Sequence, residues 1–437
     1  MRKVAVIGGG WAGCAAAVEL ASTDVAVTLF ESARTLGGRA RAVDVNGRLL
    51  DNGQHILLGA YSESLRLIRK VGIDTDAALL RLPLQMRYPS GSGMDFVTPR
   101  LPAPLHMLAG LLRARGLTVD DKLSLARFST TARWMDWRMN TDCSVSELLE
   151  RFDQTDRLIR LMWRPLCIAA LNTPPERASA QVFLNVLRDS LGARRHASDM
   201  LLPRIDLSAL FPLKAAALIE AARGSVRPGT TVKRLWRDER GWRIELADAN
   251  GGSEERFDAV VVATQPGHAA ALLDGLTDTS ALVNLGHEPI TTCYLQYPER
   301  VRLDQPFFAL VDDASKRHWG QFVFDRGQLE SAHAGLLAVV VSASRDAIAT
   351  GHEALAASVA AQLAVSLNNP ALTQPLWSRV ISEKRATFSC TPGLMRPPNM
   401  TDCEGLVLAG DYTAGDYPST LEAAVRSGML AANLVAS

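Results

Sequence analysis

Residues 4–13 read Val-Ala-Val-Ile-Gly-Gly-Gly-Trp-Ala-Gly, a short apolar run that ends in a glycine-rich turn. Such a run predicts a buried strand, and the small residues from Ala12 to Ala21 follow it with helical spacing. A second apolar run covers Val25 to Phe30. Strand, glycine turn, helix and strand in this order open a doubly wound α/β sheet of the Rossmann type, so we expect a dinucleotide-binding domain.

The glycines of this turn fit the dinucleotide-binding pattern G-x-G-x-x-G. Gly8 would permit the tight turn, Gly10 would let the backbone approach a pyrophosphate, and Gly13 would let the helix pack closely on the strand. Glu31 ends the next strand 18 residues after Gly13, where a carboxylate accepts hydrogen bonds from ribose hydroxyls. In a chain with 32 glycines an ordinary turn is the alternative, but the place between a strand and a helix favours a nucleotide site.

Composition narrows the class of protein. The 437 residues are 47% hydrophobic, and 47 Lys and Arg balance 46 Asp and Glu, which argues against a protein that coats nucleic acid. The six cysteines form no C-x-x-C pair, so we expect neither a disulfide framework nor a metal site. The N-terminal apolar run is too short for a signal peptide, and no apolar stretch reaches the roughly 18 residues of a membrane span. We therefore expect a cytoplasmic protein.

The pattern changes along the chain in a way that predicts two interleaved domains. Strand-like runs return at residues 231–235, 242–246 and 257–264, and again at 405–411. The segments between them mix helical apolar spacing with a few strand-like runs, such as 291–297 and 336–341. We expect residues 1–84, 221–287 and 386–437 to form the dinucleotide-binding domain. Residues 85–220 and 288–385 would form an α+β substrate domain.

Two further stretches near the N-terminus carry candidate binding residues. Gly37-Gly38-Arg39 follows the acidic residue, and an arginine there is well shaped to bind the same diphosphate, although a solvated basic turn is the alternative. Asp51-Asn52-Gly53-Gln54-His55 is a polar turn before apolar residues. A hairpin turn with an incidental histidine is the competing interpretation of that turn.

The C-terminal stretch predicts a strand that ends at Gly410-Asp411 and a final helix. Ser419 or Thr420 would cap this helix, and Glu422 in its first turn is more simply a capping carboxylate than a catalytic one. The positive end of the helix dipole would stabilise negative charge that develops on a bound ligand.

Together these stretches resemble the FAD-dependent amine oxidase and carotenoid desaturase superfamily. Within it, residues 11–16, 50–61 and 163–172 are similar to the squalene-associated branch, the hydroxysqualene dehydroxylases of bacterial hopanoid synthesis. The resemblance implies FAD as cofactor and places a backbone contact to adenine at Val232. The residues then expected to bind FAD are Gly8, Gly10, Ala12, Gly13, Glu31, Gly38, Arg39, Gly53, Gln54, His55, Val232, Gly410, Asp411, Thr420 and Leu421.

The resemblance also implies a long apolar isoprenoid substrate and a reductive reaction. Loss of water from an allylic alcohol leaves a cation, which takes a hydride from N5 of the reduced flavin; the electron donor to FAD is not indicated. A carotenoid-type desaturase or an amine oxidase would reverse the electron flow, and Tyr412 and Tyr417 would then be candidates for an aromatic cage. A non-catalytic FAD-binding module is the third hypothesis. Tryptophans such as Trp163 could line an apolar tunnel, but core packing explains them as well.

Two finer hypotheses complete the sequence analysis. Residues 101–115 are apolar, contain prolines and end in two arginines, so they predict a peripheral contact with the inner face of the membrane, with a core-packing helix as the alternative. His55 is the candidate proton donor to the leaving hydroxyl, because its ordinary pKa lies near 6.5. A structural hydrogen bond is the competing role for His55, and Asp51 would either orient its ring or cap the turn.

Overall fold

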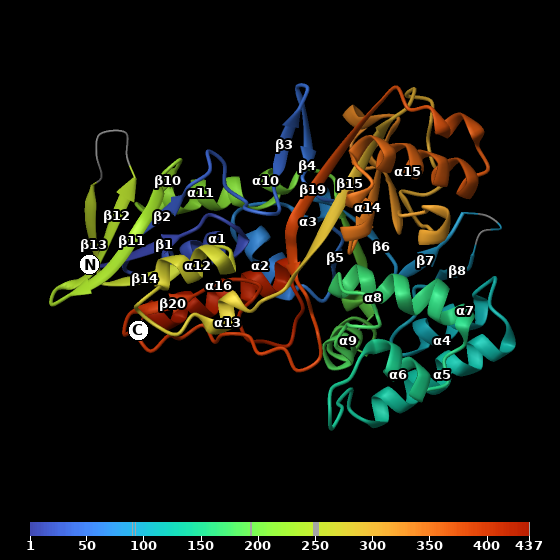
Figure 1. The fold of residues 1–437 in the computed structure, drawn as a ribbon, viewed down its shortest axis with the longest axis horizontal. Coiled ribbons are helices and arrows are strands. Elements are labelled where there is room, and N and C mark those ends of the chain that lie inside the picture. Colours follow the sequence, from blue (N-terminus) through green and yellow to red (C-terminus); the bar gives the residue numbers. More distant parts are fainter. Residues whose placement is uncertain (90, 92, 193–194, 248–252, 437) are drawn as a thin grey trace.

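The apolar run at the start of the chain forms β1 (Arg2–Ile7), the central strand of a parallel sheet in the computed structural model of the chain (Figure 1). The structure describes residues 1–89, 91, 93–192, 195–247 and 253–436. The strand order is β10-β2-β1-β14-β20, which confirms the expected doubly wound arrangement. The other strands of this sheet are β2 (Val25–Glu31), β10 (Ser225–Pro228), β14 (Ala259–Val262) and β20 (Leu406–Leu408).

One face of the parallel sheet is covered by helices. The final helix, α16 (Leu421–Ala436), packs on α1 (Trp11–Leu20), and α11 (Pro212–Ala221) packs on α1 from another side. Of the ten residues of α1 all but Glu19 are buried, which explains its run of small and apolar side chains. The shorter helices on this side are α2 (Ser62–Lys70), α3 (Thr75–Ala78) and α10 (Leu207–Leu210).

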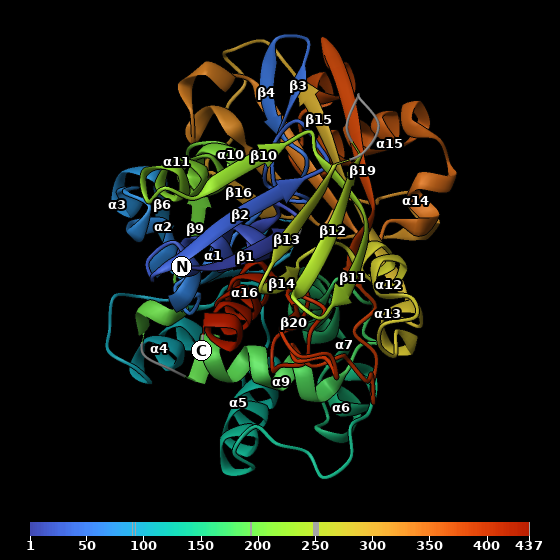
Figure 2. The same cartoon turned by 90° about the vertical axis from the view of Figure 1, so that its left-hand side faces the viewer.

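The opposite side carries a separate antiparallel sheet of β11 (Thr231–Asp238), β12 (Gly241–Ala247) and β13 (Glu254–Phe257) (Figure 2). The expectation of one continuous strand over 257–264 is wrong, because Phe257 ends β13 and Ala259 begins β14 of the parallel sheet. Asp258 joins the two sheets, since its carboxylate accepts from the Lys3 N–H at 2.6 Å. Helices α12 (Pro266–Leu273) and α13 (Ser280–Val283) follow β14.

A second large sheet is antiparallel, with the order β16-β17-β18-β15-β19. Its strands are β15 (His287–Gln296), β16 (Phe307–Ala309), β17 (Phe322–Asp325), β18 (Leu336–Ser342) and β19 (Trp377–Phe388). Residues of α14 (Arg345–Ala349) and α15 (His352–Ser366) share a buried core with this sheet. The predicted strand-like runs at 291–297 and 336–341 fall on β15 and β18.

The remaining helices form a lobe beside this sheet (Figure 1). They are α4 (Leu105–Arg113), α5 (Val119–Trp134), α6 (Val145–Arg151), α7 (Asp156–Leu158), α8 (Arg164–Leu171) and α9 (Ala180–Leu187), with π-helical turns at Ile159–Trp163 and Arg188–Gly192. Short 3₁₀ turns occupy Arg195–Ala197, Ala314–Lys316, Arg326–Gln328, Ser331–His333 and Pro370–Thr373. There are also three small sheets. One pairs β3 (Ala42–Val45) with β4 (Arg48–Asp51), and another pairs β7 (Gln85–Arg87) with β8 (Asp95–Val97). In the third, β9 (Met200–Pro203) lies between β5 (Leu57–Leu58) and β6 (Leu79–Leu82).

Packing suggests one change to the proposed domain boundaries. Leu207, Leu210, Phe211 and Ile219 belong to the buried cluster formed around α1, not to the core of the helical lobe. We therefore propose that the segment from about residue 200 belongs with the dinucleotide-binding domain, although its sequence reads as part of the helical stretch before it.

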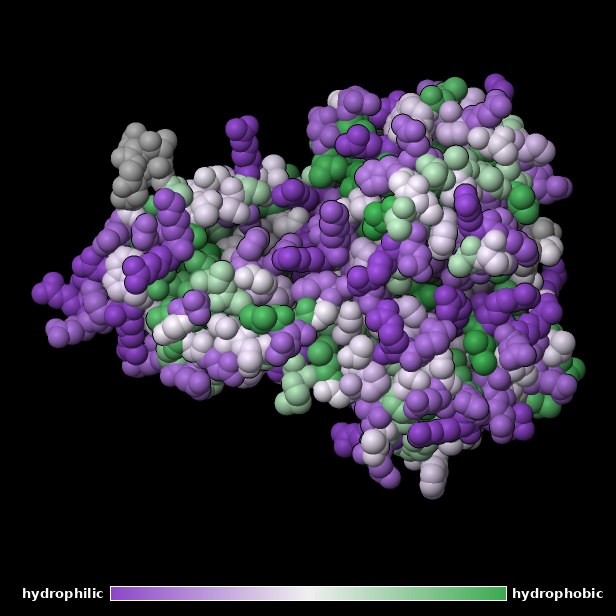
Figure 3. All heavy atoms as spheres, in the orientation of Figure 1, coloured by the Kyte–Doolittle hydropathy of each residue, from purple (hydrophilic) through white to green (hydrophobic). Residues whose placement is uncertain are grey.

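Hydrophilic side chains predominate on the face of the molecule drawn in Figure 3, and hydrophobic ones are scattered among them. Among the described residues, no helix is both long enough and apolar enough to cross a membrane.

Candidate active site

One cavity of about 820 Å³ extends from the carboxyl ends of the parallel strands into the space beside the second sheet and the helical lobe. A doubly wound sheet binds its ligand at this edge, where the strand order reverses. With the exception of Gly13, all of the predicted FAD-binding residues line the cavity. They are Gly8, Gly10, Ala12, Glu31, Gly38, Arg39, Gly53, Gln54, His55, Val232, Gly410, Asp411, Thr420 and Leu421.

The glycines near the start of α1 have different roles: some are required by the backbone turn or by helix packing, and others line the cavity. Gly8 has φ +107°, and a Cβ there would lie 2.6 Å from the Ala263 carbonyl oxygen. Gly13 does not reach the cavity, because a Cβ on it would lie 1.8 Å from the Gly8 carbonyl oxygen. Gly10 and Gly38 face each other with little more than backbone between them, and both line the cavity. Gly8 and Gly13 are therefore needed for the strand–helix turn. Gly10 and Gly38 leave room for a ligand close to the backbone.

The N-terminus of α1 is open toward the cavity. Gly10 is its N-cap residue, no described side chain caps the helix, and its first turn carries no acidic residue. The uncapped N–H groups and the helix dipole together favour an anionic group such as a diphosphate. Glu31 lies beside this turn, where its two carboxylate oxygens each accept a backbone N–H at 2.7 Å, from Gly9 and from Ala33. The Ser32 hydroxyl also donates to Oε1 at 3.2 Å, so Oε2 is the oxygen that keeps a lone pair for a hydroxyl of a ligand.

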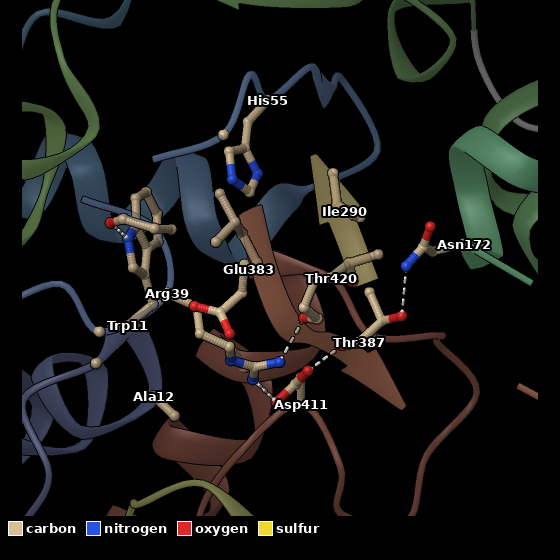
Figure 4. A pocket seen from close by; sticks show the side chains of 18 of the residues that line it. Trp11, Ala12, Arg39, His55, Asn172, Ile290, Glu383, Thr387, Asp411 and Thr420 are labelled. Carbon is tan, nitrogen blue, oxygen red and sulfur yellow. Dashed lines mark hydrogen bonds and ion pairs between the residues drawn. The ribbon is translucent and has the colours of Figure 1, made fainter. Parts of the chain in front are cut away.

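Arg39 is bound between two segments of the chain rather than extended freely into the cavity (Figure 4). Its guanidinium donates to the Asp411 carboxylate and, at 2.6 Å, to the Ala386 carbonyl oxygen. Burial opposes the charge, but Asp411 and Glu383 raise the pKa of Arg39, so it stays cationic. The predicted contact of Arg39 with a diphosphate therefore remains a prediction, and its observed partner is another predicted FAD ligand.

The polar turn before β5 is held by the second sheet. The amide of Gln54 donates to the Tyr294 hydroxyl at 3.2 Å and accepts from Arg326 at 3.1 Å. Asp51 does not orient His55, because its carboxylate accepts from the Leu207 N–H at 2.8 Å and so joins this turn to α10. Burial raises the pKa of Asp51 to about 7. Among the described contacts the Asp51 carboxylate fills neither of the two roles considered for it, because it binds the start of α10 rather than its own turn or the ring of His55.

His55 faces the cavity but does not carry the charge that its proposed acid role needs (Figure 4). Burial, and then the nearby charge of Arg39, lower its pKa to about 4. At neutral pH the imidazole is therefore neutral. The hypothesis that His55 is the cationic proton donor is not supported by these surroundings.

The C-terminal helix begins where the sequence predicts, but Glu422 in its first turn binds another helix. Thr420 is the N-cap, since its hydroxyl accepts from the Ala423 N–H at 3.1 Å. Ser419 instead donates to Asp411. Glu422 is fully buried and caps the neighbouring helix α2, accepting from the Ser64 N–H at 2.9 Å and from the Ser64 hydroxyl at 2.7 Å. Glu422 is therefore a capping carboxylate, but for another helix.

The tyrosines do not form an open aromatic cage. Arg426 lies 5.0 Å from the ring centroid of Tyr417, and the Tyr417 hydroxyl donates to Asp189 at 2.8 Å. Tyr412 is buried against the backbone of Gly410, and among the described residues its hydroxyl has no hydrogen-bond partner. Burial raises the pKa of both tyrosines, so both keep their protons. A buried hydroxyl without a partner at the edge of the cavity suits a bound ligand, cofactor or substrate, that accepts a hydrogen bond from it.

Sequence reasoning missed the far part of the cavity, which is mainly apolar. Its lining includes Met86, Phe96, Met162, Leu166, Val186, Ile290, Phe322, Phe324 and Val340. It also missed Glu383, beside Arg39, and Thr387, which accepts from the Asn172 amide at 2.9 Å. No motif marks these residues. Alternation along β17 and β19 could have pointed to Phe322, Phe324, Glu383 and Thr387, but alternation does not say which face a cavity occupies.

Comparison with known proteins gives the family of the chain. A family model described as flavin containing amine oxidoreductase matches residues 11–436. The chain belongs to this family. It is 29% identical to a hydroxysqualene dehydroxylase of Rhodopseudomonas palustris over 99% of this chain and 98% of the relative. It is 25% identical to a zeta-carotene desaturase of Zea mays, over 98% of this chain and 82% of the relative. The solved structure of a cyclohexylamine oxidase from Brevibacterium oxydans has the same fold, with a TM-score of 0.69 at 16% identity over 100% of this chain and 98% of that one.

The chain is an FAD-dependent oxidoreductase. Its residues fit the cofactor: the uncapped N-terminus of α1 suits the diphosphate, Glu31 suits the ribose, and the N-terminus of α16 suits the pyrimidine edge of the flavin ring.

Proposed function

We propose that this enzyme removes the hydroxyl group of hydroxysqualene and forms squalene. The main support is that one cavity extends from the FAD-binding turn into a space that is lined mainly by apolar side chains. Such a space suits a long hydrocarbon better than a small polar amine. The relative that is 29% identical over nearly its whole length carries the name of this activity. In the overall reaction, hydroxysqualene and reduced FAD give squalene, water and oxidised FAD.

The apolar lining has two tasks in this reaction. Side chains such as Met86, Phe96 and Phe322 would hold an extended isoprenoid and keep water away from the allylic cation that forms when the C–O bond breaks. The substrate carbon would be held where reduced FAD, when bound, supplies the hydride. Positioning of this kind accounts for a large part of such rate enhancements.

The leaving oxygen needs a proton, and the charge states in the cavity narrow its source. His55 is neutral at pH 7, whereas Tyr61, Tyr412 and Tyr417 line the same cavity and keep their protons because burial raises the pKa of each. We propose that a tyrosine hydroxyl, or a water bound to one, delivers this proton. Among the three, Tyr412 has an uncommitted hydroxyl within the described part of the chain.

The cavity argues against the amine oxidase alternative more than against the desaturase. A cationic amine would lose its hydration in a space that is lined mainly by apolar side chains. A desaturase would use the same apolar space and differs in the direction of electron flow.

Anaerobic mixing separates these functions. Photoreduced enzyme mixed with hydroxysqualene should regain the absorbance of oxidised flavin while squalene accumulates. A desaturase would leave photoreduced enzyme unchanged, and its oxidised form would be bleached by a more saturated isoprenoid. An amine oxidase would be bleached by a primary amine. Either of these latter results would contradict the proposal.

A further inference from the structure

The outer face of α4 is apolar where an ordinary surface helix is polar. Leu105, Leu108 and Leu112 recur at i, i+3 and i+7 and are 52%, 54% and 66% exposed. The inner face of the same helix contributes His106 and Leu111, which are buried. The leucines therefore face away from the core, which reverses the usual amphipathic arrangement.

A second apolar face continues this surface on α5. Val119 and Leu123, at the start of α5, are 72% and 56% exposed, and Trp134 at its end is 85% exposed. The two helices adjoin, because the Lys122 ammonium donates to the Leu112 carbonyl oxygen at 2.9 Å. Figure 2 shows α4 and α5 at the edge of the helical lobe. We call this surface the α4–α5 face; it comprises Leu101, Leu105, Leu108, Leu112, Val119, Leu123 and Trp134.

Basic side chains lie close in sequence to the residues of the α4–α5 face. Arg100, Arg113 and Arg115 are exposed, and Lys122 is half-buried. Of the two carboxylates in this stretch, Asp120 is exposed, whereas Asp121 is buried and accepts from Thr118 and Thr155. Cations therefore outnumber accessible carboxylates around the apolar residues. This charge complements an anionic surface.

The α4–α5 face lies directly over the apolar part of the cavity. A Cβ on Gly110, on the inner side of α4, would lie only 3.2 Å from Phe96 Cε2. Phe96 and its cross-strand partner Met86 both line the cavity. One helix, about 10 Å thick, therefore separates the exposed leucines from the space assigned to the isoprenoid.

We propose that the α4–α5 face docks on an anionic phospholipid bilayer and lets the isoprenoid pass between the bilayer and the cavity beneath α4. Exposed leucines would enter the acyl boundary, a tryptophan at one end would lie at the headgroup level, and the arginines would contact lipid phosphates. The passage of the isoprenoid rests on the proposed function, whereas docking itself does not.

Vesicle flotation tests the docking. Holoenzyme should float with vesicles of phosphatidylglycerol and phosphatidylcholine, and less with phosphatidylcholine alone or at high salt. The combined change Leu105→Ser, Leu108→Ser and Leu112→Ser should lower the ratio of bound to free enzyme at least about 10-fold. The matched control replaces exposed residues elsewhere, namely Val283→Ser, Val365→Ser and Leu376→Ser, and should float as wild type. Arg113→Glu with Arg115→Glu should weaken only the binding to anionic vesicles.

FAD content and thermal unfolding show whether each variant is folded. Equal flotation of wild type and of the folded leucine variant would overturn the proposal, and so would an equal loss in the control. A concentration-dependent dimer that the leucine variant abolishes, with no vesicle binding, would mean that a second copy covers this face instead.

Activity measurements separate docking from chemistry. The leucine variant should keep its rate on detergent-dispersed hydroxysqualene and lose it on vesicle-borne substrate. An enzyme inactive on both substrates yet bound to vesicles would contradict the proposed function alone.

Discussion

Individual residues in this site were easier to locate from the sequence than to assign a charge or a partner. The motif placed His55 and Arg39 beside the cofactor turn, and both line the cavity. Their charge and contacts depend on distant segments: the partner of Arg39 is Asp411, 372 residues away, and the charge on Arg39 helps to keep His55 neutral. Spacing along the chain contains no information about such pairings.

At this scale we predict that His55→Gln leaves turnover near the wild-type rate at pH 7 and FAD fully bound. The pKa of His55 is about 6.5 when unfolded and about 4 when folded, so the unfolded chain binds a proton that the folded one excludes. The free energy of unfolding therefore falls as pH decreases from about 6.5 to 4, and His55→Gln should remove this part of the acid sensitivity. Urea unfolding of both proteins at pH 7.5 and pH 5 measures this change in the free energy of unfolding. A loss of activity by 10²- to 10⁴-fold, the usual span for general acid catalysis, would restore His55 as the acid.

A second prediction at this scale concerns Glu31. Glu31→Ala removes the carboxylate beside the ribose position and should weaken FAD binding by about 1–3 kcal/mol, the usual cost of a lost charged hydrogen bond. Titration of the apoprotein with FAD gives the dissociation constant. Glu404→Ala is the matched control, because this exposed carboxylate pairs with Arg237 on the surface and does not line the cavity. Unchanged FAD affinity in Glu31→Ala would remove this residue from the binding site.

At the scale of elements, sequence patterns predicted the strand–turn–helix start, the strands β11, β12, β15 and β18 and the final helix, but not β16, β17 or β19 of the second sheet. They missed β10, which joins the parallel sheet beside β2, and they joined β13 to β14. β10 is only partly buried and so lacks the apolar run that marks a strand, whereas Phe257 at the end of β13 is followed closely by the apolar residues of β14, with no turn signal between them. The packing of α1 on α16 was also not predictable, since it depends on one small residue in each helix.

That packing gives the third prediction. A Cβ on Gly428 of α16 would lie 2.1 Å from the Ala12 carbonyl oxygen of α1, so Gly428→Ala must push the helices apart. Overpacking of this kind typically costs about 1–3 kcal/mol in the free energy of unfolding. Because Ala12 and Leu421 both line the FAD site, FAD retention should fall too. Gly415→Ala, where a Cβ meets no atom within 4 Å, should change stability by no more than about 0.5 kcal/mol. Equal stability of the two variants, measured by chemical denaturation, would contradict the packing argument.

At the scale of the whole molecule, the glycine motif and its companions were enough to predict the fold class and FAD. They were not enough to predict the substrate space, which is built from β7, β8, the helical lobe and the second sheet. Apolar residues such as Phe96 and Phe322 are indistinguishable from core residues until the segments are assembled around a cavity. The substrate class therefore depends on the assembled cavity and on the relatives, while the cofactor follows from local sequence.

The central claim is that reduced FAD in this enzyme delivers a hydride to the carbon that bore the hydroxyl group. The most direct measurement is one anaerobic turnover of photoreduced enzyme with hydroxysqualene in D₂O, followed by mass spectrometry of the product. Exchange with solvent labels the transferable hydrogen of the reduced flavin, so the account predicts one squalene with one deuterium at that carbon for each flavin reoxidised. Recovery of unchanged hydroxysqualene with the flavin still reduced, or squalene without deuterium, would contradict it.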